Sequence, residues 1–196
     1  LPLAEQLGAI FSGLLNELPE IVEIEFAGEI GGYDNKITEL SAVKGLLSGI
    51  TDQPISYVNA IDVAKDHGVQ IRSVTTTSSA DYVNTVTIRG GGHAIAGTLV
   101  GLKGEARIVM VDDHTVDMPP STHMVILRND DRPGVIGKVG TILGEEKINI
   151  VDMNVGRSKD GLGALMVIST QDEVPNAIAE LLIQTDGVTR CSVLNL

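Results

Sequence analysis

Residues 123–143 read HMVILRNDDRPGVIGKVGTIL, which is an apolar run, a polar loop and a second apolar pattern. The run 123–127 predicts a short buried strand, and the apolar residues after the loop recur with helical spacing over 133–145. Pro133 fits the first turn of that helix, and Asp131 is placed to cap it. At a helix N-terminus the bare N–H groups attract a carboxylate, while Asp131 can hold an ammonium. Opposite charges so close together suit a free amino acid.

The pattern around this stretch continues to the end of the chain. Its apolar periodicity predicts strand, helix, strand, strand, helix and strand over 124–128, 133–145, 147–156, 162–170, 174–184 and 188–195. Lys159-Asp160-Gly161 supplies the turn of the central hairpin, and a change of phase predicts a β-bulge near 150–152. The order βαββαβ predicts a ferredoxin-like domain, an antiparallel sheet with both helices on one face and the other face bare.

The first part of the chain predicts a different, α+β domain. Its pattern gives an opening helix that ends before Pro19, a strand at 21–30, helices at 36–50 and 57–67, and strand-like runs at 69–77, 82–89, 94–102, 106–111 and near 116. Glycine-rich turns between neighbouring runs favour an antiparallel sheet. Met118-Pro119-Pro120-Ser121 is the expected linker, so we expect an α+β fold class with domains at 1–120 and 121–196.

Composition excludes several classes of function. A net charge of −12 disfavours binding to nucleic acid or to an anionic membrane, because both need basic patches. One cysteine excludes an internal disulfide framework, and no apolar run is long enough to cross a membrane, so we expect a soluble cytoplasmic protein. The chain begins at Leu1 rather than at a methionine, so we expect it to be a piece of a longer protein.

Two further groups of residues could bind a ligand. Arg89 and His93 flank three glycines and could hold a phosphate, although a hairpin turn explains the same residues. Asp112-Asp113-His114 with Asp117 has the side-chain types of a metal site, but acidic turns on such an acidic protein are usually solvated, and we predict no metal site.

The remaining candidates have structural explanations. Gly134, Gly137 and Gly140 fall on one helical stripe without the Gly-x-Gly-x-x-Gly spacing of a dinucleotide loop, so we expect them to let the helix approach the sheet. Cys191 alternates with apolar neighbours, which predicts a buried, inert thiol. No Ser/His/Asp or Cys/His set with a recognisable context is present, and no catalytic residue is predicted.

Residue order adds a family resemblance. The βαββαβ pattern, together with the loop after residue 128 and Ile148-Asn149-Ile150, resembles an ACT domain. The order of residues is similar to that of the C-terminal ACT domain of D-3-phosphoglycerate dehydrogenase. Further segments with this likeness are 155–157 and 163–167 in the ACT domain, and 96–101, 107–109 and 117–119 before it, which resemble the intervening domain of the long form of that family. An intervening domain of this kind also occurs in bacterial serine dehydratases.

The resemblance implies an L-serine effector site between ACT domains of neighbouring subunits. The family's positions map onto Asn129, which would contact the ligand's side-chain hydroxyl, Asp131, which would bind its ammonium, and Asn149, which would come from the neighbouring subunit. The wider implied site is Asn129, Asp131, Pro133, Gly134, Val135, Ile136, Asn149 and Ile150. Position 129 is often His or Tyr in the family and is Asn here, which departs from the pattern at the position that would contact the ligand's side chain, so the implied effector is L-serine or a similar small amino acid.

The resemblance also implies partners that this chain lacks. NAD and the catalytic residues would belong to an upstream domain, and the ACT domains would assemble the protein into a homodimer or homotetramer. Arg107 fits a second anionic-effector site of some relatives, but Pro119 and Ser169 replace the basic residues expected there. Two alternatives stay open: a purely structural oligomerisation module without a ligand, and the regulatory part of an L-serine dehydratase.

Overall fold

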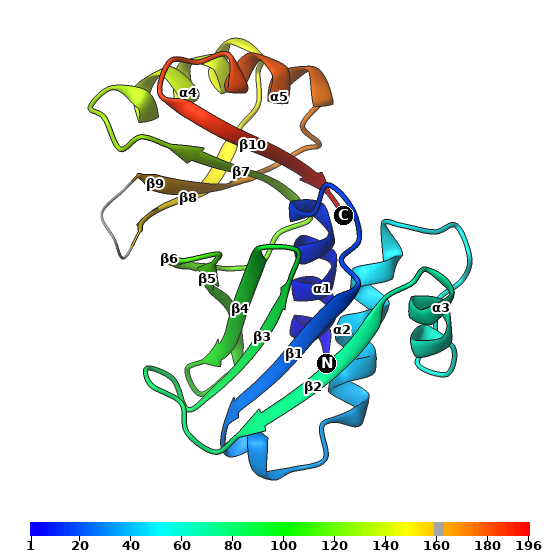
Figure 1. Cartoon of the computed structure of the whole chain (residues 1–196). Helices are drawn as coiled ribbons and strands as arrows, with labels where there is room; N and C mark the ends of the chain where they lie inside the picture. Colours follow the sequence, from blue (N-terminus) through cyan, green and yellow to red (C-terminus); the bar gives the residue numbers. More distant parts are fainter. Residues whose placement is uncertain (159–162) are drawn as a thin grey trace. The chain divides into compact units, whose positions relative to one another are not determined.

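The chain divides into two units, Leu1–Asp112 and Asp113–Leu196, in a computed structural model that describes residues 1–158 and 163–196 (Figure 1). The division falls just before strand β6 (His114–Met118), which contacts strands of the second unit. The boundary predicted from sequence, between residues 120 and 121, lies after β6. The predicted turn Lys159-Asp160-Gly161 lies outside the described residues.

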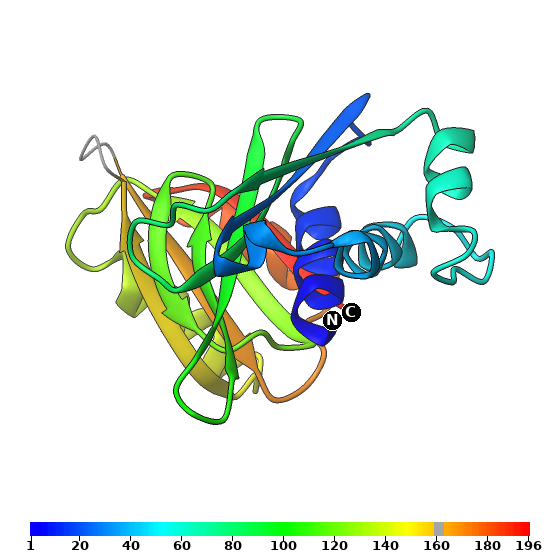
Figure 2. The ribbon, with the colours of Figure 1, turned by 90° about the horizontal axis from the view of Figure 1, so that it is seen from below.

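The first unit combines helices with a sheet. Its elements are α1 (Pro2–Leu14), β1 (Ile21–Gly28), the 3₁₀ helix η1 (Glu29–Gly32), α2 (Lys36–Ser48), α3 (Ala60–Asp66), β2 (Gln70–Thr76), β3 (Asn84–Gly90), β4 (His93–Val100) and β5 (Glu105–Val111). These strands follow the order β2-β1-β3-β4-β5. Figure 2 shows α1 and α2 side by side, and their contact is glycine-lined: a Cβ on Gly8 would lie 2.0 Å from the carbonyl oxygen of Ala42.

One strand pair of this sheet differs from the antiparallel arrangement predicted. Strands β1 and β2 run parallel, with Ile21 opposite Gln70 and Ala27 opposite Thr76, whereas β1–β3, β3–β4 and β4–β5 are antiparallel. The physical reason is the connection: α2 and α3 lie between β1 and β2, and a crossover of that length returns the chain to the same end of the sheet.

The second unit has the predicted βαββαβ order. After β6 it contains β7 (His123–Asn129), α4 (Val135–Glu145), β8 (Ile150–Arg157), β9 (Ala164–Thr170), α5 (Asn176–Ile183) and β10 (Val188–Asn195). The sheet order is β10-β7-β9-β8, with every neighbouring pair antiparallel. The register of β8 against β9 shifts between Ile150 and Asp152, which confirms the predicted bulge.

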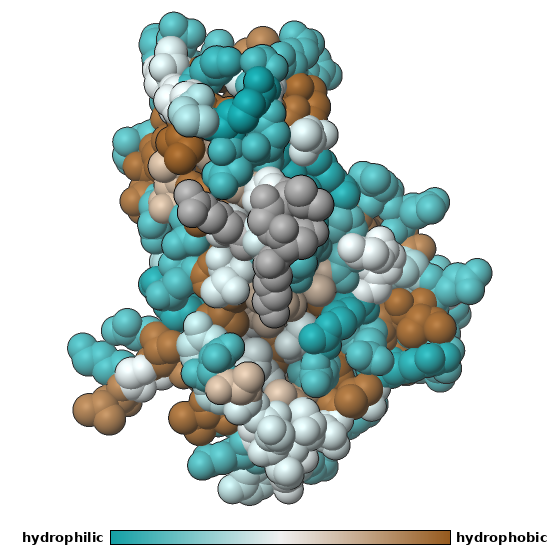
Figure 3. Space-filling view, turned by 60° about the vertical axis from the view of Figure 1, so that its left-hand side comes forward, coloured by the Kyte–Doolittle hydropathy of each residue, from teal (hydrophilic) through white to brown (hydrophobic). Residues whose placement is uncertain are grey.

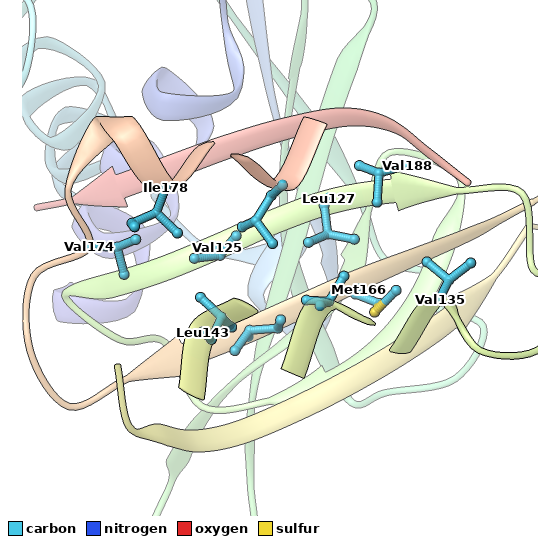
Figure 4. Packing of buried hydrophobic residues seen from close by; sticks show 11 residues of the cluster. Val125, Leu127, Val135, Leu143, Met166, Val174, Ile178 and Val188 are labelled. Carbon is cyan, nitrogen blue, oxygen red and sulfur yellow. The ribbon is translucent and has the colours of Figure 1, made fainter. Parts of the chain in front are cut away.

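A single apolar cluster joins both helices to one face of this sheet (Figure 4). Every third or fourth residue of each helix points into it, which explains the helical periodicity of the sequence. The buried members are Val125, Leu127, Val135, Val139, Leu143, Met166, Ile168, Val174, Ile178, Leu182 and Val188. Burial of each such side chain contributes roughly 1.5–3 kcal/mol, so this cluster holds the helices and the loops at their ends in place.

The other face of the sheet is not bare, contrary to the prediction. All seven residues of β9 are buried, and a strand that alternates its side chains can be buried throughout only when both faces are covered. Strand β6 contacts β8 and β9, and its Val116 and Met118 are buried. The prediction took no account of β6, the strand-like run expected near residue 116, as a cover for this face.

Candidate functional site

Asn129, the last residue of β7, is buried and fastens the loop that follows it. In the orientation that satisfies the whole amide, Nδ2 donates to the carbonyl oxygen of Ala164 on β9 at 3.1 Å. Its Oδ1 accepts from the backbone N–H of Asp131, also at 3.1 Å. The amide predicted to contact a ligand is therefore engaged within the domain, where it sets the start of the loop.

The loop ends at the N-terminus of α4, but with a different cap from the one predicted. Helix α4 begins at Val135, its N-cap is Gly134 in the left-handed conformation (φ 94°), and no side chain caps it. Asp131, itself at φ 52°, is therefore not the cap, and Pro133 precedes the helix. The glycine caused the difference, because a left-handed residue at position 134 cannot belong to the right-handed first turn.

The start of α4 keeps donors that point out of the helix. The N–H of Val135 reaches the carbonyl oxygen of Arg132 at 3.4 Å, and that of Lys138 makes the first helical bond, to Gly134 at 3.1 Å. Within the described residues, the N–H groups of Ile136 and Gly137 have no partner. Such donors, at the positive end of the helix dipole, suit a carboxylate.

Asn149 lies at the end of the sheet opposite to the end that carries Asn129 and the Asp131 loop. Its Nδ2 donates to Oε1 of Gln171 at 3.0 Å, and its carbonyl oxygen accepts from the N–H of Gln171 at 3.0 Å. The neighbouring Ile150 pairs with Thr170, whereas Asn129 pairs with Ala164 at the far end of β9. Six residues of strand separate these ends by about 20 Å, so one domain cannot bring Asn149 to Asn129 and Asp131.

An apolar flank lies between α4 and the edge strand β8. Lys138 approaches Asp186, in the turn after α5, at 3.7 Å, which places α5 on its side of α4. On the helix, Ile136 lies about 160° around the axis from Lys138 and is 46% exposed. On β8, Met153 and Val155 are also exposed. Figure 3 colours apolar residues brown and shows that such residues reach the surface of the molecule.

The helix glycines do not bring α4 close to the sheet, so that prediction was wrong. A Cβ on Gly137, Gly140 or Gly144 would meet no other heavy atom within 4 Å. These positions face away from Val135, Val139 and the rest of the buried stripe. The outer surface of α4 is therefore smooth and uncovered within the described chain.

Arg89 and His93 of the first unit each face a carboxylate, and the structure does not group them with Arg107. Arg89 donates to Glu25 at 2.5 Å, and His93 pairs with Asp112 at 3.0 Å. Gly90 pairs directly with His93 across a two-residue turn, which confirms the hairpin interpretation of the glycine run. Arg107 is opposite Thr98, about 13 Å along β4 from the Arg89 pair, so the three cations do not form one site.

The acidic turn 112–114 is likewise engaged by protein groups. Ser158 Oγ donates to Asp113 at 2.8 Å. Burial alone would raise the pKa of Asp113, but this hydrogen bond and the nearby charges of His114 and Arg128 outweigh it and lower that pKa. Across residues 1–158 and 163–196, no three His, Cys, Asp or Glu side chains are grouped as a metal site would require.

Cys191, on β10, is half-buried against the apolar cluster. Burial raises the pKa of its thiol to about 11, so at neutral pH the group is protonated, as predicted for an inert thiol. Among the helices described, none has the length and apolar character needed to cross a membrane.

The sequence missed a polar connection that holds the loop to a distant turn. Arg132 donates to Asp130 beside it and to Asp186 at 2.9 Å, and the N–H of Asp130 donates to the carbonyl oxygen of Gly187 at 3.0 Å. Asp186 and Gly187 lie in the gap between the predicted helix 174–184 and the predicted strand 188–195. Nothing local marks it as a partner of Arg132, because 54 positions separate the two residues.

Comparison with known proteins matches both units to described families. The profile of the D-3-phosphoglycerate dehydrogenase intervening domain matches residues 1–112, and that of the ACT domain matches residues 123–187. A solved ACT domain from the GTP pyrophosphokinase of Chlorobium tepidum matches 37% of this chain and 95% of its own at 16% identity, with a TM-score of 0.28, too low to support a conclusion.

Curated relatives match over nearly the whole chain. The D-3-phosphoglycerate dehydrogenase of Synechocystis sp. is 31% identical over 96% of this chain and 35% of its own length. That of Mycobacterium leprae is 29% identical and that of Archaeoglobus fulgidus 31% identical, each over 100% of this chain and 38% of the relative. The chain therefore spans little more than a third of the length of these relatives.

Proposed function

The chain belongs to the D-3-phosphoglycerate dehydrogenase family, of which it represents the C-terminal part with its ACT domain, and we propose that this part binds L-serine between two copies of the ACT domain. The bound amino acid would inhibit a dehydrogenase portion that the relatives carry and this chain does not span. The observation that supports this proposal most directly is the pair of N–H groups without a partner at the start of α4, next to the loop that contains the carboxylate of Asp131.

The chemistry of this end of the domain supports a neutral amino acid as the ligand. The N–H groups of Ile136 and Gly137 would receive the carboxylate, and the carboxylate of Asp131 would receive the ammonium. The side chain of Asn129 already makes one hydrogen bond at its nitrogen and one at its oxygen, so it holds the loop, and its second N–H and second lone pair could meet the hydroxyl of the ligand. The ligand class is therefore a small zwitterion, for which L-serine is the probe of choice.

The geometry of the edge strand supports a second copy as the source of Asn149. Strand β8 is the last strand of its sheet, and a two-fold axis beside it would pair it antiparallel with its own copy. Antiparallel pairing sets the start of one β8 beside the end of the other. Asn149 of one copy would then approach the end of the sheet where the other copy carries Asn129 and Asp131.

The exposed flank supports the same pairing. Ile136, Met153 and Val155 would meet the same flank of a second copy whose sheet continues from β8. Exposed apolar side chains on an edge strand are a liability in a monomer, and burial between two copies removes it. The open glycines on the outer surface of α4 would let a second helix approach closely.

NAD does not fit the two domains described. Gly137 and Gly140 lie within helix α4, and neither they nor the glycines of the loop between β1 and α2 have the Gly-x-Gly-x-x-Gly spacing of a dinucleotide-binding loop. We assign NAD, and the oxidation that it would support, to the part of the relatives beyond this chain. The names of the relatives favour a dehydrogenase over the serine dehydratase alternative.

Titration calorimetry with L-serine tests the proposal. The wild-type chain should give heat with L-serine, and Asp131→Asn should abolish it, because the change removes the charge that binds the ammonium while preserving side-chain size. Asp172→Asn, an exposed carboxylate elsewhere in the same domain, is the matched control and should bind as the wild type does. No heat with millimolar L-serine or with other small amino acids would refute the proposal and leave the structural oligomerisation module as the function.

A further inference from the structure

Arg132 lies in the middle of the loop that carries the proposed ligand site, and its guanidinium bridges two carboxylates. It donates to Asp130 through Nε and to Asp186 through Nη2, the second at 2.9 Å. Lys138 adds a weaker contact to the other oxygen of Asp186, at 3.7 Å. The loop after β7 and the turn between α5 and β10 are thus joined by charged groups from three segments of the chain.

The backbone joins the same two segments. The N–H of Asp130 donates to the carbonyl oxygen of Gly187 at 3.0 Å. Gly187 has φ 97°, and a Cβ there would lie 2.7 Å from Cγ2 of Val135 and 2.9 Å from Oδ1 of Asp130. The turn therefore packs against both the loop and the first residue of α4 so closely that no side chain fits between them.

These contacts hold a loop that has an unfavourable backbone. Asp131 adopts φ 52°, a left-handed conformation that is unfavourable for a residue with a side chain, so neighbouring contacts must hold it there. On the N-terminal side of Asp131, the side-chain oxygen of Asn129 accepts a hydrogen bond from the backbone N–H of Asp131. On the other side, Arg132 anchors the chain to Asp186.

We infer that Arg132 is a positioning residue: it fastens the Asp131 loop to the Asp186-Gly187 turn and so presets the loop for its ligand. By the same contacts, occupancy of the ligand site is coupled to the junction of α5 and β10. The hydrogen bond to Arg132, with its charge, also lowers the pKa of Asp186, so the carboxylate that anchors the loop is ionised throughout the physiological range. This inference relies on the proposed function only for its binding measurement.

Hydrogen exchange on the ligand-free 196-residue chain tests the positioning role directly. Arg132→Gln and Asp186→Asn should each raise exchange of the amides in 129–137 roughly three- to tenfold, the range expected for the loss of one or two exposed ion pairs. The double variant should exchange little faster than Arg132→Gln alone, because both changes break the Arg132–Asp186 bridge and only the weaker Lys138–Asp186 contact is lost in addition. Lys65→Gln, which breaks the exposed Lys65–Asp62 pair of α3, is the matched control and should change nothing in this segment.

L-serine calorimetry then separates positioning from general stability. Arg132→Gln should weaken binding roughly three- to tenfold while the midpoint of thermal unfolding falls by no more than about 3 °C. Gly187→Ala should weaken binding too, whereas Gly68→Ala, which also has a positive φ but open space around it, should lower only the unfolding midpoint.

The outcomes distinguish the two proposals. Unchanged exchange of 129–137 in both Arg132→Gln and Asp186→Asn would overturn the positioning role, whatever the ligand. The positioning role would also be overturned if the Arg132→Gln variant bound L-serine as tightly as the wild-type chain does. A wild-type chain that gives no heat with L-serine would refute the proposed function, and the exchange measurement would still decide the role of Arg132.

Discussion

Gly140→Ala offers a sharp test of how α4 is placed. Alanine is favoured over glycine within a helix by about 1 kcal/mol, and the new Cβ would meet no heavy atom within 4 Å. The substitution should therefore stabilise the ACT domain by nearly the full difference, which corresponds to a rise of roughly 4–8 °C in the unfolding midpoint of a domain of this size. The opposite is expected of Gly8→Ala in α1, because its Cβ would overlap the carbonyl oxygen of Ala42 at 2.0 Å. Helix propensity gains about 1 kcal/mol there as well, but separating two packed helices costs about 1–3 kcal/mol.

The assay is thermal unfolding followed by circular dichroism. The protein concentration is kept low enough that light scattering shows the chain to be monomeric. A rise with Gly140→Ala and a fall with Gly8→Ala would support the reasoning. A lower midpoint for Gly140→Ala in the monomer would refute it, since that result requires a neighbour against α4 that the structure does not contain. If Gly140→Ala lowered the unfolding midpoint only at concentrations where the chain assembles, α4 would instead lie in the contact between copies.

Four further predictions address assembly, packing and ionisation. Met153→Asp should shift the chain from dimer to monomer in sedimentation experiments, because it adds a charge to the exposed flank of the edge strand. Leu143→Ala should lower the free energy of unfolding by about 2–5 kcal/mol in urea titration, because Leu143 is fully buried in the ACT core. The pKa of Asp113 is lower in the folded protein than its ordinary value of 3.8, so ionised Asp113 stabilises the fold at pH values above 3.8. This stabilisation is lost as the pH falls from 3.8 through the lower pKa of the folded state. Ser158→Ala should therefore destabilise the protein at pH 5 and destabilise it less near pH 3. Cys191, with a pKa of about 11, should react slowly with iodoacetamide at pH 8 and rapidly only in denaturant.

Much of the fold was predictable because it depends on local periodicity. The six elements of the ACT domain and the bulge after Ile150 follow from the spacing of apolar residues, which the buried cluster requires. The parallel pairing of β1 with β2 was not predictable in this way. Strand direction depends on where the crossover through α2 and α3 returns, and no residue within either strand records it.

The site shows the same division between local and distant causes. The sequence correctly indicated a helix N-terminus after the loop, because Pro133, Gly134 and the apolar stripe are neighbours. It missed the true cap, since a left-handed Gly134 and a helical Pro133 are both compatible with the same residues. It missed Arg132 and Asp186 altogether, because their contact exists only once α5 and β10 have folded against the loop.

The separation of Asn149 from the Asp131 loop has a consequence for physiology. If each pocket is completed by a neighbour, then ligand uptake and self-association are thermodynamically linked, and each strengthens the other by the same factor. Dilution would blunt the response to the amino acid, and the amino acid would hold subunits together. Sensitivity to the amino acid would then depend on how much of the protein the cell makes.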